Sequence, residues 1–252
     1  MAKSQKHDII LKKLIVAIAG GRRGRGMAFL VFDLGGTLMK YQGMPANWSD
    51  FYLDGFQRVN DALQLNLTNQ ELMDACEILR SYNPRICGRE KEYSPEYLFE
   101  KAIVSWNRPS LCPSTLVEYF FDGLKLVPII YDDTIPFLNL YRAGRGHAAI
   151  LTDLPSAMPD QLIRQHISKL LPYFGFYVSS ATCGYRKPNP AGLQYLAGKW
   201  KTKLSELCLI GDEEKDEKTA KAAGCRFIKI DRSGKNPQLP HNLSELSSVL
   251  GL

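Results

Sequence analysis

Three polar side chains stand at the ends of short apolar runs, and a lysine stands in a loop before a helical pattern. These four residues are Asp33, Thr152, Asp212 and Lys187. Two carboxylates, a hydroxyl and an ammonium group suit a divalent metal ion together with an anionic substrate. Mg²⁺ prefers one or two carboxylates, a carbonyl oxygen, waters and phosphate oxygens. The residue types therefore predict metal-assisted chemistry, provided that the fold brings them together.

The apolar runs before the first three residues are expected to be strands of one parallel sheet. They are Phe29–Phe32, His147–Leu151 and Leu207–Ile210. Such short apolar runs are typical of strands that are buried on both faces. Because the carboxyl ends of parallel strands meet at one edge of the sheet, residues far apart in the sequence can line a single crevice there.

Between the first two of these strands the pattern becomes helical, from Ala46 to about Leu124. One set of apolar residues repeats at helical spacing: Trp48, Tyr52, Phe56, Val59 and Leu63. Thr68 with Glu71 forms a capping box that opens a second helix, and Ser94 before Pro95 is typical of the start of a third. We therefore expect an all-helical insert of subdomain size.

After about Asp132, strands and helices alternate. Helices are expected over 160–171 and 190–200 and from Asp212 to about Ala223, and strands over Phe174–Val178 and Phe227–Ile230. The fold class is thus α/β, a doubly wound parallel sheet with an inserted helical subdomain. We assign the chain as follows: residues 1–26 to a basic extension, 27–41 and 128–252 to the α/β core, and 42–127 to the helical insert.

The net charge of +6 resides in the amino-terminal extension. Residues 1–26 hold seven basic side chains and one acidic one, which leaves 25 of each sign in the rest of the chain. The body is therefore neutral, and no nucleic-acid partner is expected. The extension is interpreted as a solvated basic segment, or as the product of a start codon read too early, with Met27 as the working initiator.

The sequence predicts a cytoplasmic protein. No apolar run approaches the length of a membrane span, so no membrane partner is expected. The uninterrupted apolar segment Leu14–Ala19 is short for a secretory signal. The six cysteines form no CxxC pair and no Cys/His cluster, so zinc is disfavoured and reduced thiols are expected. The oligomeric state is not readable.

Four segments together resemble the motifs of the haloacid dehalogenase-like hydrolase superfamily, in the family's order. They are Phe32–Leu38 (FDLGGTL), Ile150–Thr152 (ILT), Lys187–Pro190 (KPNP) and Gly211–Asp216 (GDEEKD). The resemblance spans about Ala28 to Ile230. The helical insert is similar to the C1-type cap of one subgroup.

The resemblance implies a Mg²⁺-dependent phosphohydrolase that acts on a small phosphorylated metabolite. Asp33 would be the nucleophile that forms an aspartyl-phosphate, and Lys187 would neutralise charge on it. Thr152, Asp153 through its backbone amide, Lys187 and Gly36 would bind the phosphoryl group. The metal ligands would be Asp33, the Gly35 carbonyl, Asp212 and Asp216, the last either directly or through waters.

Gly35 departs from the family pattern. Phosphatases of this family place a second aspartate there as general acid and base, and its loss is worth roughly 10²- to 10⁴-fold in rate. Acyl and aryl phosphates need least protonation of the leaving group. Two alternatives follow: a weakly active or silent protein that binds a phosphorylated ligand or a protein partner, and attack at carbon or at a phosphonate.

The insert offers no clear replacement for the missing acid. Arg89, Glu90 and Glu92 form a charged segment that we interpret as solvated surface. The aromatic residues of the insert are expected to pack its helices rather than to contact ligand. They are Trp48, Phe51, Tyr52, Trp106, Phe120 and Phe121.

Overall fold

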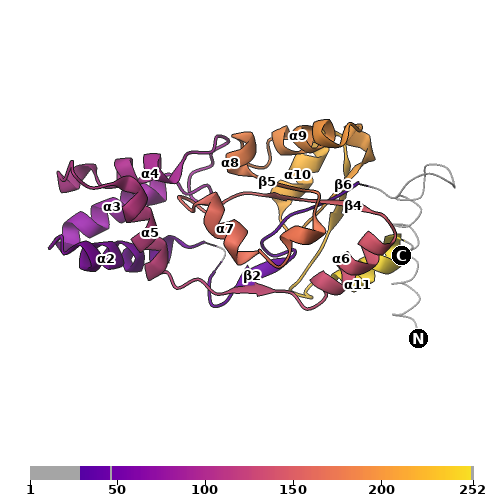
Figure 1. Cartoon of the computed structure of the whole chain (residues 1–252), viewed down its shortest axis with the longest axis horizontal. Helices are drawn as coiled ribbons and strands as arrows, with labels where there is room; N and C mark the ends of the chain where they lie inside the picture. Colours follow the sequence, from indigo (N-terminus) through magenta and orange to yellow (C-terminus); the bar gives the residue numbers. More distant parts are fainter. Residues whose placement is uncertain (1–28, 46, 251–252) are drawn as a thin grey trace.

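A parallel five-stranded sheet forms the centre of the molecule (Figure 1). The computed structural model describes residues 29–45 and 47–250, so the amino-terminal extension assigned to 1–26 and the alternative initiator Met27 lie outside the described residues. The sheet has the order β5-β4-β1-β6-β7. Its strands are β1 (Phe29–Phe32), β4 (His147–Thr152), β5 (Phe176–Ser179), β6 (Leu207–Gly211) and β7 (Arg226–Lys229). This order, with β1 in the middle, is that of a doubly wound sheet and confirms the predicted fold class.

Both faces of the sheet are covered because alternate strand residues point to opposite sides. Val31 and Leu209 pack with α9 (Ala191–Trp200) and α10 (Glu214–Ala223). Phe32 and its neighbours pack on the other face with α6 (Thr134–Ala143) and α11 (Leu243–Leu250). The apolar runs are therefore continuous, as expected for strands buried on both sides.

Four helices follow β1 and gather at one end of the molecule, opposite α6 and α11 (Figure 1). They are α2 (Tyr52–Leu63), α3 (Asn69–Ser81), α4 (Pro95–Ala102) and α5 (Pro113–Gly123). The predicted capping box at Thr68 is present, and the Ser94 side chain accepts a hydrogen bond from the backbone of Tyr97. Rings of Phe56, Phe99 and Phe120 meet in the middle of these helices.

A two-stranded antiparallel ribbon joins the helical part to the sheet and was not predicted. It pairs β2 (Met39–Tyr41) with β3 (Pro128–Ile130). Each strand has three residues, and the partners are separated by the whole insert, so neither periodicity nor a hairpin turn marks them. The assignment of 42–127 to a separate cap stays a prediction, and its ends fall beside these two strands.

The remaining elements differ from expectation by small shifts. The helix expected over 160–171 is shorter, because α7 (Asp160–His166) ends at His166 and a 3₁₀ turn, η3 (Leu171–Tyr173), follows. Four other short elements complete the described chain: α8 (Ser180–Cys183), η1 (Ser49–Phe51), η2 (Val104–Trp106) and η4 (Leu204–Glu206). Among the described residues, no helix combines the length and apolar character that crossing a membrane requires.

Candidate active site

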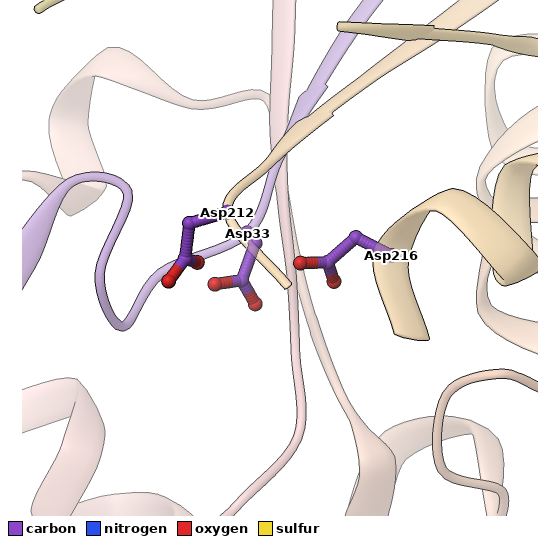
Figure 2. A group of neighbouring side chains, drawn as sticks. All are labelled: Asp33, Asp212 and Asp216. Carbon is purple, nitrogen blue, oxygen red and sulfur yellow. The ribbon is translucent and has the colours of Figure 1, made fainter. Parts of the chain in front are cut away.

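Three aspartates point toward one another at the carboxyl edge of the sheet (Figure 2). Asp33 follows β1, Asp212 follows β6, and Asp216 lies in the first turn of α10. One carboxylate oxygen from each lies within 4.8 Å of the others. An all-oxygen donor set of this kind suits a hard divalent cation such as Mg²⁺.

The strand register explains why Asp33 and Asp212 meet. Phe32 on the central strand pairs with Ile150 on one side and Ile210 on the other. The backbone N–H of Asp33 donates to the carbonyl of Ile210 at 2.8 Å, which extends the ladder by one step. Thr152, at the end of β4, therefore lies at the same edge.

Lys187 connects two of the aspartates. Its ammonium group forms ion pairs with Asp33 and with Asp216, the latter at 2.5 Å. The side chain is 2% exposed, and Asp216 is fully buried. A buried lysine in this position places a positive charge directly beside the carboxylate that was predicted to be the nucleophile.

The three aspartates carry more negative charge than Lys187 can neutralise, and the pKa values of Asp33 and Asp212 are raised. Burial raises the pKa of the Asp33 carboxyl to about 8; the Lys187 ammonium opposes the rise, whereas Asp216 and Asp212 add to it. Burial likewise raises the pKa of Asp212 to about 6, with Asp216 contributing. Burial alone would lower the pKa of Lys187, but Asp216 and Asp33 raise it well above its ordinary value. A divalent cation would relieve this excess of charge.

The hydrogen bonds distinguish the three carboxylates. Asp216 has both oxygens engaged, one with Lys187 and one with the backbone N–H of Glu213 at 3.0 Å. Asp33 accepts from Lys187 through Oδ1, and Asp212 accepts from Thr37 through Oδ1 at 3.2 Å. Among the described residues, Oδ2 of Asp33 and Oδ2 of Asp212 have no hydrogen-bond donor. These two oxygens are thus free of donors, while both oxygens of Asp216 are engaged.

The two glycines after Asp33 differ in what surrounds them. Gly35 is exposed, and a Cβ built on it meets no atom within 4 Å. Gly36 has a φ of +76°, and a Cβ there would lie 2.2 Å from Oδ2 of Asp212. The N–H of Gly36 already donates to the carbonyl of Met39 at 2.8 Å. The geometry therefore gives Gly36 a role in making room for Asp212, rather than a free amide for substrate.

Thr152 and Asp153 follow β4 and border the same space. Thr152 is buried, and its hydroxyl lies 3.4 Å from the Asp153 carbonyl. The Asp153 carboxylate accepts from the backbone N–H of Lys187 at 3.0 Å and pairs with Lys215 at 3.3 Å. Although burial would raise the pKa of Asp153, Lys215 and Lys187 lower it. Asp153 thus fixes the loop that carries Lys187.

A cavity of about 930 Å³ lies between the aspartates and the helical insert. All the predicted site residues except Asp216 line it. Four of the six aromatic residues that were expected to pack the insert also line this space: Trp48, Tyr52, Phe120 and Phe121. Tyr52, Phe120 and Phe121 are nevertheless buried and pack against one another, which confirms the expected packing. Trp106 also packs internally, with its ring against Phe56. The expectation that these rings do not contact ligand stays a prediction.

The charged segment after α3 is bound to α8 and to the loop between α8 and Lys187, so its interpretation as solvated surface was wrong for Arg89 and Glu92. Their side chains are 10% and 7% exposed and form an ion pair. Glu92 also binds Arg186 and accepts from the Ser180 hydroxyl at 2.5 Å. Glu90 is exposed, as expected. A bridge between Lys91 and Tyr185 completes this contact, which we call the clasp (Arg89, Glu92, Ser180 and Arg186 with the Lys91–Tyr185 bridge).

Several residues of the site carried no usable sequence signal. Arg186 and Glu92 are far apart in the sequence, and only the fold brings them together. Arg85 reaches from the insert to Glu213, the neighbour of Asp212. Thr37 lies within the first motif and was overlooked as a partner of Asp212, although a hydroxyl so close to Asp33 was a reasonable candidate.

Comparison with known proteins places these features in context. The family model described as haloacid dehalogenase-like hydrolase matches residues 27–224. A phosphoglycolate phosphatase of Photobacterium profundum is 25% identical over 207 residues, which cover 81% of this chain and 82% of that protein. A phosphoglycolate phosphatase of Aliivibrio fischeri is 28% identical over 115 residues, 46% of this chain, and here the chain spans about half (50%) of the relative's length.

A solved structure supports the same fold. The 2-haloacid dehalogenase from Pseudomonas syringae pv. tomato has a TM-score of 0.63 and 21% sequence identity, with 90% of this chain and 99% of that chain covered. At this level of identity the likeness concerns the architecture: the sheet, its flanking helices and the inserted helices.

Proposed function

Because this chain belongs to the haloacid dehalogenase-like hydrolase family, we propose that it is a Mg²⁺-dependent phosphatase of small phosphorylated molecules, with Asp33 as the nucleophile. The observation that carries the proposal is the grouping of Asp33, Asp212 and Asp216 beside a large cavity, with Lys187 bridging Asp33 and Asp216. The named relatives are phosphoglycolate phosphatases, which supports phosphate monoesters as the substrate class.

Mg²⁺ fits the donor set of this site. Oδ2 of Asp33, Oδ2 of Asp212 and the Gly35 carbonyl are the atoms that we propose as its ligands, and Asp216 acts behind them through Lys187 and bound waters. When bound, Mg²⁺ would neutralise charge on the phosphoryl group and on the carboxylates. Within the described chain, no hydrogen bond reaches the Gly35 carbonyl, so this oxygen is free for that role.

The residues of the chain divide the remaining work. The Asp33 carboxylate attacks phosphorus, the bond between phosphorus and the leaving oxygen breaks, and an aspartyl-phosphate results. Lys187 holds Asp33 in place and offsets negative charge on the phosphoryl oxygens. The Thr152 hydroxyl and the Asp153 backbone N–H are proposed to donate hydrogen bonds to those oxygens. Water then hydrolyses the acyl phosphate and restores Asp33.

The alternative of a silent binding protein rests on Gly35, where the acid–base aspartate is missing. The rest of the constellation argues against it, because buried carboxylates around one lysine are costly to maintain. The two functions differ in turnover. A cytoplasmic location remains part of the proposal, and the six free cysteines agree with a reducing compartment.

Phosphate release decides between these functions. Purified protein is incubated with an aryl phosphate and with a panel of sugar, nucleotide and two-carbon phosphates, with Mg²⁺ or with EDTA. We expect release that requires Mg²⁺ and is lost in Asp33→Asn, which keeps the shape of the side chain. Release that persists in the variant, or none from any substrate, would reject the proposal; binding of phosphorylated ligands without release would favour the silent protein.

A further inference from the structure

We infer that the substrate is an aryl phosphate, a phosphate ester of a phenol, whose ring lies in the aromatic part of the cavity. This inference rests on the proposed phosphatase function and narrows its substrate class. Two independent features carry it: the composition of the cavity wall facing the insert, and the chemistry of the leaving group at Gly35.

The cavity wall away from the aspartates is aromatic. Tyr41 and Trp48 meet edge to face at 5.2 Å, and both line the cavity. The Tyr41 hydroxyl is already bonded to Nδ1 of His166 at 2.8 Å, and the Tyr52 hydroxyl accepts from Asn83 at 3.0 Å. Phe121 adds a fourth ring. Tyr52 and Phe121 are buried, so Tyr41 and Trp48, which are half-buried, provide most of the accessible ring surface. Ring faces and edges of this kind suit a planar aromatic ligand.

The size of the cavity points the same way. Its volume of about 930 Å³ lies at the upper end of the roughly 300–1,000 Å³ that is usual for drug-sized ligands. A two-carbon ester such as phosphoglycolate would occupy a small part of it beside Asp33 and leave the aromatic wall in contact with water. A ring system attached to the phosphate would fill that part and displace the water.

The cations of the insert that border the cavity are held in ion pairs. Arg85 is paired with Glu213, and Arg89 shares Glu92 with Arg186. Within the described residues, Nη2 of Arg89 is buried without a hydrogen-bond partner, so the charge of this wall does not by itself select an uncharged leaving group.

Gly35 supplies the chemical argument. When Asp33 attacks phosphorus, the leaving oxygen takes the electron pair of its bond to phosphorus, and an alkoxide needs a proton at that moment. A phenolate is stable enough to leave without one and collects its proton from water afterwards. Because Gly35 has no side chain to donate a proton, aryl esters should react faster than alkyl esters by at least about 100-fold.

The test compares three substrates in the full-length protein with Mg²⁺: 2-naphthyl phosphate, phenyl phosphate and phosphoglycolate. The first two have similar leaving groups and differ in ring size, so their ratio of kcat/KM reports contact with the wall. We expect 2-naphthyl phosphate to exceed phenyl phosphate, and both to exceed phosphoglycolate by about 100-fold or more. Trp48→Ala should reduce the naphthyl-to-phenyl ratio by roughly three- to tenfold, as expected for one lost aromatic contact.

Tyr195→Ala is the matched control, because Tyr195 is an exposed aromatic residue of α9 outside the cavity, and its ratio should not change. Circular dichroism checks that each variant folds. If Trp48→Ala does not fold, competitive inhibition of the wild type by 2-naphthol and by phenol compares the binding of the larger and the smaller ring instead. Faster release from phosphoglycolate, a naphthyl-to-phenyl ratio that Trp48→Ala leaves unchanged, or equal inhibition by the two phenols would overturn the inference while leaving the phosphatase function intact. Absence of release from all three esters, with release from sugar or nucleotide phosphates, would also overturn the inference. Absence of release from every phosphate ester tested would instead reject the proposed function.

Discussion

Replacing Gly35 with aspartate should supply the acid–base group that the site lacks. Gly35 is exposed to the cavity, its φ lies outside the left-handed region, and a Cβ there meets no atom within 4 Å. The new side chain can therefore be accommodated without moving Asp33 or its neighbours. We expect the free energy of unfolding to change by no more than about 0.5 kcal/mol, as for other unhindered surface positions.

The expected gain depends on the leaving group. General acid catalysis is worth roughly 10²- to 10⁴-fold, or about 2.7 to 5.4 kcal/mol of activation free energy. Phosphoglycolate and other alkyl esters should gain kcat within this range, because their alkoxide then leaves as an alcohol. Phenyl phosphate should gain much less, since its leaving group departs unprotonated. The substitution should thus narrow the preference for aryl esters.

The assay measures kcat for both ester types at saturating Mg²⁺ in the wild type, Gly35→Asp and Gly35→Asn. Asparagine has the same shape but no titratable proton, so it controls for packing and for contacts with substrate. If Gly35→Asn raised the rate as much as Gly35→Asp, or if both ester types gained equally, the reasoning about the missing acid would be refuted. A loss of activity with all substrates would show that Gly35 makes room for another group.

Three further changes test other parts of the site. Mg²⁺ binding should release protons between about pH 6 and 8, because burial raises the pKa values of Asp33 and Asp212 to about 8 and about 6 and the ion requires both carboxylates ionised. The Mg²⁺ affinity should therefore rise with pH up to about 8, and calorimetry in buffers of different ionisation enthalpy that detected no proton release would contradict this. Gly36→Ala should weaken Mg²⁺ binding at least about tenfold, because the added Cβ would lie 2.2 Å from Oδ2 of Asp212 and displace that carboxylate. If the Mg²⁺ affinity measured by calorimetry stayed unchanged, Gly36 would not be needed to make room for Asp212. Glu92→Gln should lower the free energy of unfolding, measured in urea, by roughly 3–5 kcal/mol, because it leaves Arg89 and Arg186 buried without a counter-charge. Glu77→Gln is the control and should change this free energy little, because Glu77 is 79% exposed in its pair with Arg80; similar values for the two variants would argue against the clasp as a stabilising contact.

The parts of this structure that sequence reasoning reached are those with local signals. The apolar runs that form β1, β4 and β6 lead to the site residues Asp33, Thr152 and Asp212. The capped starts of two helices in the insert, at Thr68 and Ser94, were predicted from two residues each. Parallel pairing then follows from the alternation of strands and helices.

The parts that it missed depend on contacts between distant segments. The ribbon of β2 and β3 pairs two segments that the whole insert separates in the sequence, and three-residue strands have no measurable periodicity. The burial of Glu92 is decided by Arg186, which no local pattern connects to it. The sequence did not show that some of these packed aromatic residues also line the cavity, because a residue that packs against one helix can border an open space on its other side.

The central claim is that Asp33 accepts the phosphoryl group. Acid quenching during turnover of an aryl phosphate, followed by peptide mass spectrometry, measures this directly. The account predicts one added phosphoryl group on the peptide that contains Asp33, and none in Asp33→Asn. A phosphoryl group on a different residue, or steady turnover with no modified peptide and with undiminished activity in Asp33→Asn, would contradict it.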